Sequence, residues 1–257
     1  MVGIRRDEVP HPVTVTLLTD GFPDDPVFDA AVSRALLERA AAGEIGPVFR
    51  LSVPGRSVQF GRMDAARPGF GAAVEEGRAL GFAPVVRLAG GRAAVFHEGT
   101  LSFARIVPEA RRDLDIERRF AEVSGLMRDA FASLGADARI GEVPGEYCPG
   151  RHSVNLAGSV KVMGIGQRLV RGASHVGGVV VVADAALVNL VLDPVYRHLG
   201  YEWDPAATGA LADAVPTDTD AVAAAIVAAL RVRHDVAPGA VDPATLEAAE
   251  RIAARGR

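Results

Sequence analysis

The sequence contains a single cysteine, Cys148, in 257 residues. One thiol alone forms no intrachain disulfide and is too few for a zinc site. It is therefore either an inert buried thiol or a nucleophile. No apolar run approaches the length of a membrane span, and the first residues lack the apolar core of a signal peptide. Together with the free thiol, these absences predict a cytoplasmic protein that does not enter the membrane.

The sequence also lacks an excess of basic residues and a metal-ligand pattern. Its net charge of −4 and isoelectric point near 5.9 argue against a nucleic-acid binder, which usually carries a basic face. Its six histidines show no His-x-x-x-His or Cys/His ligand spacing, so we expect no metal site. Hydrophobic residues make up 49% of the chain, which is enough for one large domain or one domain with a small appendage.

The cysteine lies in a segment rich in turn formers, Gly145-Glu146-Tyr147-Cys148-Pro149-Gly150. Free cysteines are among the most buried residues, so the inert thiol is the default interpretation. Pro149 and the flanking glycines instead indicate a loop, and reactive side chains are over-represented on loops. Lys161 follows a few residues later and would stabilise a thiolate if the fold brings the two together. The segment therefore favours a nucleophile.

The hydrophobic pattern predicts helices and strands that are mixed without the strict alternation of a parallel doubly wound sheet. This arrangement is typical of the α+β class. The predicted helices cover residues 26–43, 67–80, 115–134, 184–190, 219–233 and 242–255, with a loop through Asp193-Pro194. The predicted strands cover residues 12–19, 48–53, 57–60, 85–88, 93–96, 101–107, 153–156, 161–167 and 174–182.

A second glycine-containing stretch runs from Arg87 to Gly99. Its adjacent Gly90 and Gly91 lie between predicted strands, where they permit positive φ angles and let backbone N–H groups approach a ligand oxygen. An ordinary hairpin turn is the alternative. The stretch is not a phosphate loop, because no Gly-Lys-Ser/Thr follows, and its spacing does not fit a dinucleotide fingerprint.

Residues 87–97 (RLAGGRAAVFH) and 161–168 (KVMGIGQR), in this order and spacing, resemble the catalytic domain shared by lipoate–protein ligases, octanoyltransferases and biotin ligases. The resemblance spans roughly residues 25–195. It implies a biotin/lipoate ligase-like fold of mixed β-sheets packed with helices. We expect an acyltransferase catalytic domain over residues 1–200 and a C-terminal helical extension over residues 201–257, packed on the same domain.

Within that family, Tyr147-Cys148-Pro149-Gly150 resembles the cysteine-dependent enzymes that move an octanoyl or lipoyl group from the glycine-cleavage H protein to lipoyl domains of 2-oxoacid dehydrogenase complexes. The resemblance implies that Cys148 carries the acyl group as a thioester and that Lys161 contacts the acyl carbonyl. These two are the predicted catalytic residues. The predicted substrate-binding residues are Arg87, Gly90, Gly91, Arg92, His97, Gly164 and Gly166.

This interpretation requires no cofactor other than the transferred octanoyl or lipoyl group. One alternative is an ATP-dependent lipoate–protein ligase, which would use ATP and Mg²⁺, although Arg92 stands where many ligases have a third glycine. Another is a non-catalytic acyl- or carrier-binding module. The sequence leaves open the acyl chain length, the donor protein, the oligomeric state and whether His97, His152 or His175 acts as a base.

Two arginine pairs, Arg111-Arg112 and Arg118-Arg119, flank acidic residues. We interpret them as a solvated helix face. The alternative is a docking patch for acidic lipoyl domains, by charge complementarity.

Overall fold

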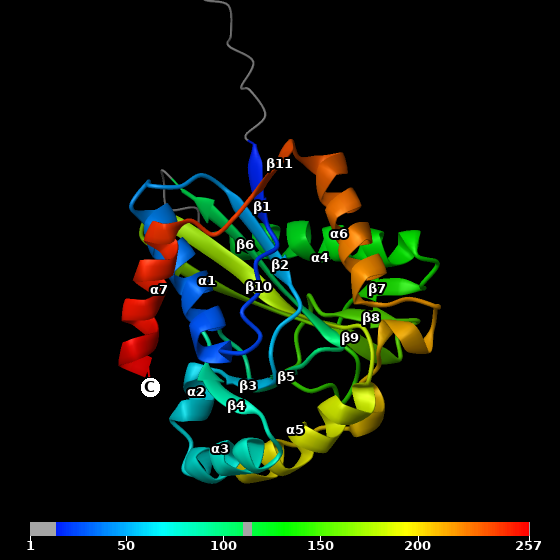
Figure 1. Cartoon of the computed structure of the whole chain (residues 1–257). Coiled ribbons are helices and arrows are strands. Elements are labelled where there is room, and N and C mark those ends of the chain that lie inside the picture. Colours follow the sequence, from blue (N-terminus) through cyan, green and yellow to red (C-terminus); the bar gives the residue numbers. More distant parts are fainter. Residues whose placement is uncertain (1–13, 110–114, 257) are drawn as a thin grey trace, which may run out of the picture.

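An eight-stranded mixed sheet forms the centre of the protein (Figure 1). The computed structural model describes residues 14–109 and 115–256. Strand β1 is parallel to both of its neighbours, whereas the remaining pairs in the sheet are antiparallel. In spatial order the strands are β11 (Val236–Gly239), β1 (Val15–Leu18), β2 (Val48–Ser52), β6 (Thr100–Pro108), β10 (Ala173–Val181), β9 (Val160–Val170), β8 (Val154–Leu156) and β7 (Ala138–Ile140).

A second, three-stranded sheet packs beside the first. Its order is β4 (Ala83–Val86), β3 (Ser57–Phe60) and β5 (Ala94–Phe96), with β3 parallel to β4 and antiparallel to β5. The glycine-containing segment of residues 87–93 connects β4 to β5 and faces the main sheet. This connection is the turn that carries most of the predicted substrate-binding residues.

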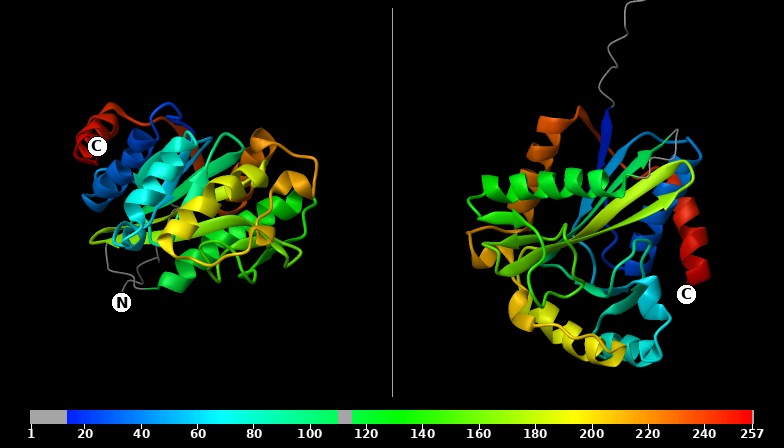
Figure 2. Two further views of the ribbon diagram at one scale, coloured as in Figure 1. Left: turned by 90° about the horizontal axis from the view of Figure 1, so that it is seen from below. Right: turned by 180° about the vertical axis from the view of Figure 1, so that it is seen from behind.

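Helices α4 (Ile116–Ser133) and α6 (Thr219–Arg233) cover one face of the main sheet, and α4 crosses it in the right-hand view of Figure 2. Asp115 caps α4 by accepting a hydrogen bond from the Arg118 N–H at 2.9 Å. The helix buries Val123, Met127 and Phe131 against apolar side chains of the strands. The 3.6-residue spacing of these side chains is what made this helix predictable.

The opposite side of the main sheet is covered in two parts. Helices α1 (Pro26–Ala41) and α7 (Pro243–Gly256) pack against each other over one part, through Ala35, Ala249 and Ala253. The small sheet covers the other part. The small sheet is backed by α2 (Arg62–Ala65), α3 (Phe70–Ala79) and α5 (Ala185–Leu199). Two short 3₁₀ helices, η1 (Pro205–Ala207) and η2 (Leu211–Asp213), follow α5.

The α+β class is confirmed, but the predicted loop at Asp193-Pro194 is wrong. Helix α5 continues through Pro194 to Leu199. Its buried face, which includes Val191 and Tyr196, offsets the loss of one hydrogen bond at the proline. The carbonyl that loses its partner belongs to Leu190, a residue that is 58% exposed, so water can satisfy it.

Residues 201–257 contribute a strand as well as helices. Strand β11 pairs with β1 at the edge of the main sheet, although Pro238 and Gly239 gave no strand signal in the sequence. Proline is tolerated at a sheet edge because no further strand needs its missing N–H. Gly200, in a left-handed conformation, ends α5 beyond the predicted end at residue 190. None of the helices in the described residues combines the length and apolar character needed to cross a membrane.

Candidate active site

Cys148 lies in the loop between β7 and β8 and has an unusual backbone conformation. Its φ angle is 43°, in the left-handed region that few non-glycine residues adopt. The Cys148 N–H donates to the Tyr196 hydroxyl at 3.0 Å, and that hydroxyl donates to the Ala93 carbonyl at 2.9 Å. The buried tyrosine on α5 thus links the cysteine loop to β5 and helps to hold the strained residue in place.

The sulfur atom of Cys148 points at the glycine-containing turn. Its Sγ accepts a hydrogen bond from the Arg92 N–H at 3.0 Å, and the Arg87 Nη2 lies 3.8 Å away. Gly91 has a φ of 100°, and a Cβ there would lie 2.9 Å from the sulfur and 2.5 Å from the Arg87 guanidinium. Glycine is required at this position because the φ angle is positive and because a Cβ would clash with the sulfur and the guanidinium. The turn thus presents a backbone amide and a cation to the sulfur.

Lys161 is buried beneath the cysteine loop, with an exposed fraction of 1%. Its ammonium donates to the carbonyls of Cys148 at 2.8 Å and Tyr147 at 2.9 Å, and to Glu146 Oε1 at 3.0 Å. An ammonium has three donors, so all three are satisfied here. In this structure Lys161 therefore holds the main chain of the cysteine loop, and its contact with an acyl carbonyl stays a prediction.

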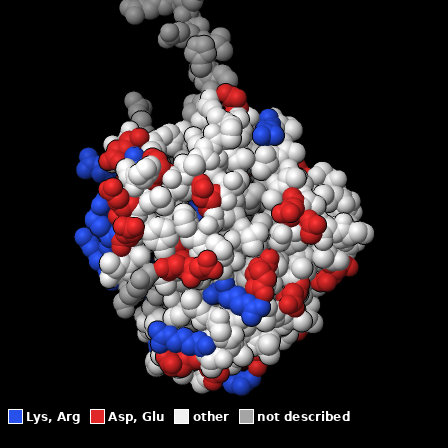
Figure 3. Space-filling view, viewed as in Figure 1, with Lys and Arg blue, Asp and Glu red and all other residues white. Residues whose placement is uncertain are grey.

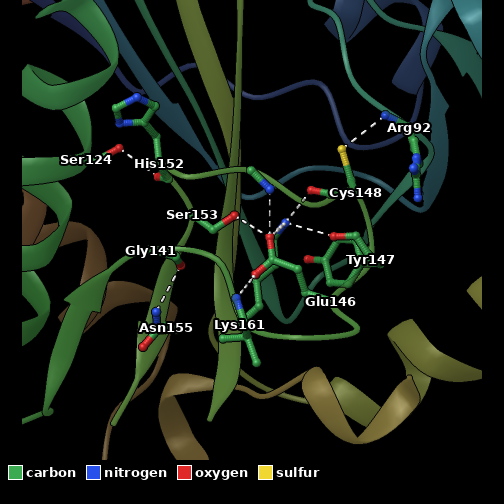
Figure 4. A network of polar contacts seen from close by, with 12 residues as sticks. Arg92, Ser124, Gly141, Glu146, Tyr147, Cys148, His152, Ser153, Asn155 and Lys161 are labelled. Atoms are coloured by element: carbon green, nitrogen blue, oxygen red, sulfur yellow. Dashed lines mark hydrogen bonds and ion pairs between the residues drawn. The ribbon is translucent and has the colours of Figure 1, made fainter. Parts of the chain in front are cut away.

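Glu146 anchors this loop through several hydrogen bonds (Figure 4). It was not among the site residues predicted from the sequence. Its side chain is fully buried. Oε1 accepts from Lys161, from the Ser153 hydroxyl at 2.7 Å and from the Gly150 N–H at 3.1 Å, and Oε2 accepts from the Val143 N–H at 2.9 Å. The carboxylate thereby joins both ends of the loop to β9. A buried charge with four donors is well compensated.

One feature of the sequence could have drawn attention to the Glu146–Lys161 pair. Lys161 is the only lysine in a chain in which lysine and arginine together number 28. An ammonium is compact and fits three converging acceptors, whereas a planar guanidinium does not. A single retained lysine in an arginine-rich sequence indicates a position where that geometry matters, and it raises the question of which carboxylate balances its charge.

A cavity of about 70 Å³ adjoins Cys148, which lies in its wall together with Arg87. Its floor is formed by small residues of the main sheet, including Gly164 and Gly166 on β9. A Cβ at Gly166 would lie 3.0 Å from the Gly90 carbonyl oxygen. The glycines let the turn between β4 and β5 approach the sheet closely, leaving a narrow, mainly apolar space suited to an acyl chain.

His175 lies in the wall of this cavity. His175, Gly177 and Val179 occupy alternate positions on β10 and line one side. Four residues of strand correspond to ~13 Å, comparable with the length of a medium acyl chain. Burial lowers the pKa of His175 to about 4, and among the described residues its Nδ1 has no hydrogen-bond partner. The imidazole is therefore neutral near pH 7.

Most of the predicted site residues come together in this region. The structure brings six of them to Cys148 or to the cavity beside it, and the carbonyl of Gly90 lies beside Gly166. The six are Lys161, Arg87, Gly91, Arg92, Gly164 and Gly166.

His97 is the exception among the predicted site residues, because it does not line the cavity. Its Nδ1 accepts from the Gly99 N–H at 3.0 Å, within the turn that follows β5. Burial lowers its pKa. His152 contacts Glu117 at 2.9 Å and stacks on Phe120, on the α4 side of the loop. Neither ring contacts the sulfur, so only His175 of the three histidines lies in the wall of the cavity.

The arginine pairs on and before α4 do not behave alike. Arg111-Arg112 lies outside the described residues, and Arg118 is half exposed. Arg119 is 1% exposed and lies 3.2 Å from Glu109. The prediction of a solvated face is wrong for Arg119, because α4 turns this side chain toward the main sheet, where its stem packs and its charge is paired.

The sequence matches the lipoyl protein ligase A/B catalytic domain family over residues 25–230, and the chain belongs to this family. It is 36% identical over 151 residues to an octanoyl-GcvH:protein N-octanoyltransferase of Geobacillus kaustophilus, covering 57% of this chain and 53% of that protein. It is 30% identical over 153 residues to a lipoyl-GcvH:protein N-lipoyltransferase of Listeria monocytogenes, covering 58% and 55%. The chain thus spans about half the length of these relatives.

Solved structures confirm the fold. A lipoate-protein ligase A bound with ATP superposes with a TM-score of 0.75 at 20% identity, covering 94% of this chain and 95% of that one. A bipartite lipoate protein ligase of Thermoplasma acidophilum, studied with its E2 lipoyl domain, gives 0.73 at 18%, covering 95% and 93%. In the part of the chain that the structure describes, no group of three His, Cys, Asp or Glu side chains could hold a metal ion.

Proposed function

We propose that this protein is an acyltransferase that moves an octanoyl or lipoyl group from the glycine-cleavage H protein to a lysine of lipoyl domains, through a thioester on Cys148. The observation that carries the proposal is the position of the sulfur. Cys148 Sγ lies in the wall of a narrow cavity and accepts a hydrogen bond from the Arg92 amide at 3.0 Å. The names of the related transferases support the donor and the acyl group.

In the first half of the reaction, the Cys148 sulfur attacks the carbonyl carbon of the acyl-lysine amide. The S–C bond forms and the C–N bond breaks, and the thiol proton ends on the departing lysine amine. An amide is unreactive, so dividing the transfer into two steps through a covalent intermediate helps. The Arg87 guanidinium and the Arg92 amide lie beside the attacking sulfur.

The negative charge on the carbonyl oxygen during attack needs donors in fixed positions. Arg87 is one, because its Nε is buried and has no partner among the described residues. Lys161 serves as a second if it exchanges the Cys148 carbonyl for the acyl oxygen. Donors of this kind are each worth about 3 kcal/mol in the transition state.

In the second half, the neutral amine of the acceptor lysine attacks the thioester. The new C–N bond forms, the C–S bond breaks, and the amine proton returns to the sulfur. Both steps balance without a nucleotide or a metal ion, so we propose that ATP and Mg²⁺ are not required. The reaction needs Cys148 to stay a reduced thiol, which favours the cytoplasm.

Intact-mass analysis tests this proposal directly. The protein is incubated with an octanoylated carrier, with free octanoate plus ATP and Mg²⁺, or with neither. We expect a hydroxylamine-sensitive octanoyl adduct in the first case, absent in Cys148→Ala, which should remain folded. Wild-type transfer rates in Cys148→Ala would end the covalent mechanism. Strict dependence on ATP with free acid, and no reaction with the carrier, would indicate a ligase, and binding without any transfer would indicate a non-catalytic module.

A further inference from the structure

A second, larger cavity of about 600 Å³ lies beside the first, between α1 and α7 on one side and β4, α2 and α3 on the other. Arginines from five separate segments converge on it. They are Arg34 of α1, Arg62 of α2, Arg78 of α3, Arg87 after β4 and Arg255 of α7. We refer to it as the arginine cavity.

Among the described residues, no aspartate or glutamate lines the arginine cavity. Arg34 and Arg78 pair with glutamates on their own helices, which offset the charge of these two arginines. Arg62 and Arg255 have no carboxylate partner among the described residues. In a protein with a net charge of −4, this concentration of positive charge is a local exception. Figure 3 shows basic side chains along the left edge of the molecule, near α7, with acidic side chains beside them.

The arginine cavity communicates with the nucleophile. Ala30, Arg87 and Leu88 line both cavities, and the Arg87 guanidinium reaches to 3.8 Å from Cys148 Sγ. The helix that carries Arg62 is also joined to the site. A Cβ at Gly61 would lie 1.9 Å from the Gly91 carbonyl oxygen, so the residue before α2 packs against the turn that contacts the sulfur.

We propose that the arginine cavity docks an acidic surface of the protein that carries the acyl group, holding its acylated lysine arm at Cys148. This proposal rests on the proposed function and names the surface that recognises the partner. Two observations favour a protein over a small anion. The positive charges are spread over five segments around an opening, and apolar side chains such as Phe70, Val74 and the half-exposed Val86 lie among them. Protein interfaces combine an apolar centre with a charged rim.

Charge reversal tests the docking surface. Arg62→Glu, Arg255→Glu and the double variant are compared with Arg231→Glu and the double variant Arg171→Glu/Arg231→Glu. The control residues are exposed arginines with no carboxylate partner among the described residues, and Arg231 lies on α6, away from the cavity. Each pair changes the net charge equally. For every variant, kcat/KM is measured with an octanoylated carrier at several salt concentrations and with a small octanoyl thioester.

For each variant we compare kcat/KM for the carrier with kcat/KM for the small thioester. In Arg62→Glu/Arg255→Glu we expect the ratio of these two values to fall at least about tenfold and to lose most of its salt dependence. The control double variant should stay within about twofold of wild type. Equal ratios in the two double variants would refute the docking surface while leaving the transferase intact. Competition by inorganic phosphate or AMP, lost in the arginine variants without any change in that ratio, would make the cavity a small-anion site instead. A wild type that takes no acyl group from any carrier would overturn the proposed function and the docking with it.

Discussion

Replacing Glu146 by glutamine should destabilise the protein strongly, although the two side chains have the same shape. All four partners of the carboxylate are donors: the Val143 and Gly150 amides, the Ser153 hydroxyl and the Lys161 ammonium. A glutamine oxygen can replace only one carboxylate oxygen. If it keeps the three contacts of Oε1, its NH₂ group faces the Val143 N–H, where two donors meet and neither is satisfied.

The larger effect of Glu146→Gln is on charge. Lys161 would remain buried without a counter-charge, and breaking a buried ion pair costs about 3–5 kcal/mol of the free energy of unfolding. For a chain of this size that corresponds to a melting temperature lower by roughly 6–20 °C. Glu142→Gln is a matched control, because Glu142 is exposed in the same loop and should change stability by less than about 0.5 kcal/mol.

Chemical denaturation of these variants measures the free energy of unfolding. A double-mutant cycle with Lys161→Met separates the pair from its surroundings, because removing both charges leaves neither one unpaired. We expect the double variant to be less destabilised than the sum of the single variants, by about 0.5–3 kcal/mol. If Glu146→Gln unfolds like Glu142→Gln, or if the cycle shows no coupling, then the buried pair does not hold the nucleophile loop.

Two further predictions concern the same region. Lys161→Ala should slow single-turnover acylation of Cys148 by about 10²–10³-fold. Lys161→Arg should restore little of this rate, because a guanidinium is planar. Near-normal acylation in Lys161→Ala would remove the lysine from the catalytic site. The second prediction is a pH dependence of stability. Burial lowers the pKa of His175 from an ordinary 6.5 to about 4, so between these values the unfolded chain binds a proton that the folded protein does not. Stability should therefore fall as the pH drops from about 6.5 to 4, by up to about 3 kcal/mol. His175→Gln should flatten this slope in denaturation curves, while the same slope in His175→Gln would assign it to other groups.

The sequence predicted the parts of the fold that depend on local pattern. Helix α4 and the hairpin of β8 and β9 lie close to their predicted positions. The helix is indicated by the regular spacing of its apolar residues, and the hairpin by its short glycine-containing turn, and both signals lie within a few consecutive residues. The course of α5 through Pro194 and the pairing of β11 were not predictable in this way. Each depends on burial or pairing against segments far away in the chain.

The candidate site likewise contains residues that could be predicted from local sequence and residues that could not. Cys148 and the Gly90-Gly91 turn could be singled out because glycine and proline mark loops. Arg87 entered the predicted site through the family resemblance alone, since its contact with Cys148 spans 61 positions. The single lysine marks Lys161, but only the fold shows that Glu146 is its partner, because opposite charges in a sequence normally indicate a solvated surface.

The strained backbone of Cys148 explains why so many contacts meet at this loop. A non-glycine residue with a φ of 43° costs of order 1–3 kcal/mol, and such strain persists only where the surroundings over-determine it. Here Tyr196 fixes the amide of Cys148, Lys161 fixes its carbonyl, and the Arg92 amide fixes its sulfur. The residue is thus held at three points by α5, β9 and the glycine-containing turn. A thiol needed only for packing would require none of these contacts, whereas a nucleophile that must present its sulfur to a narrow cavity requires all three.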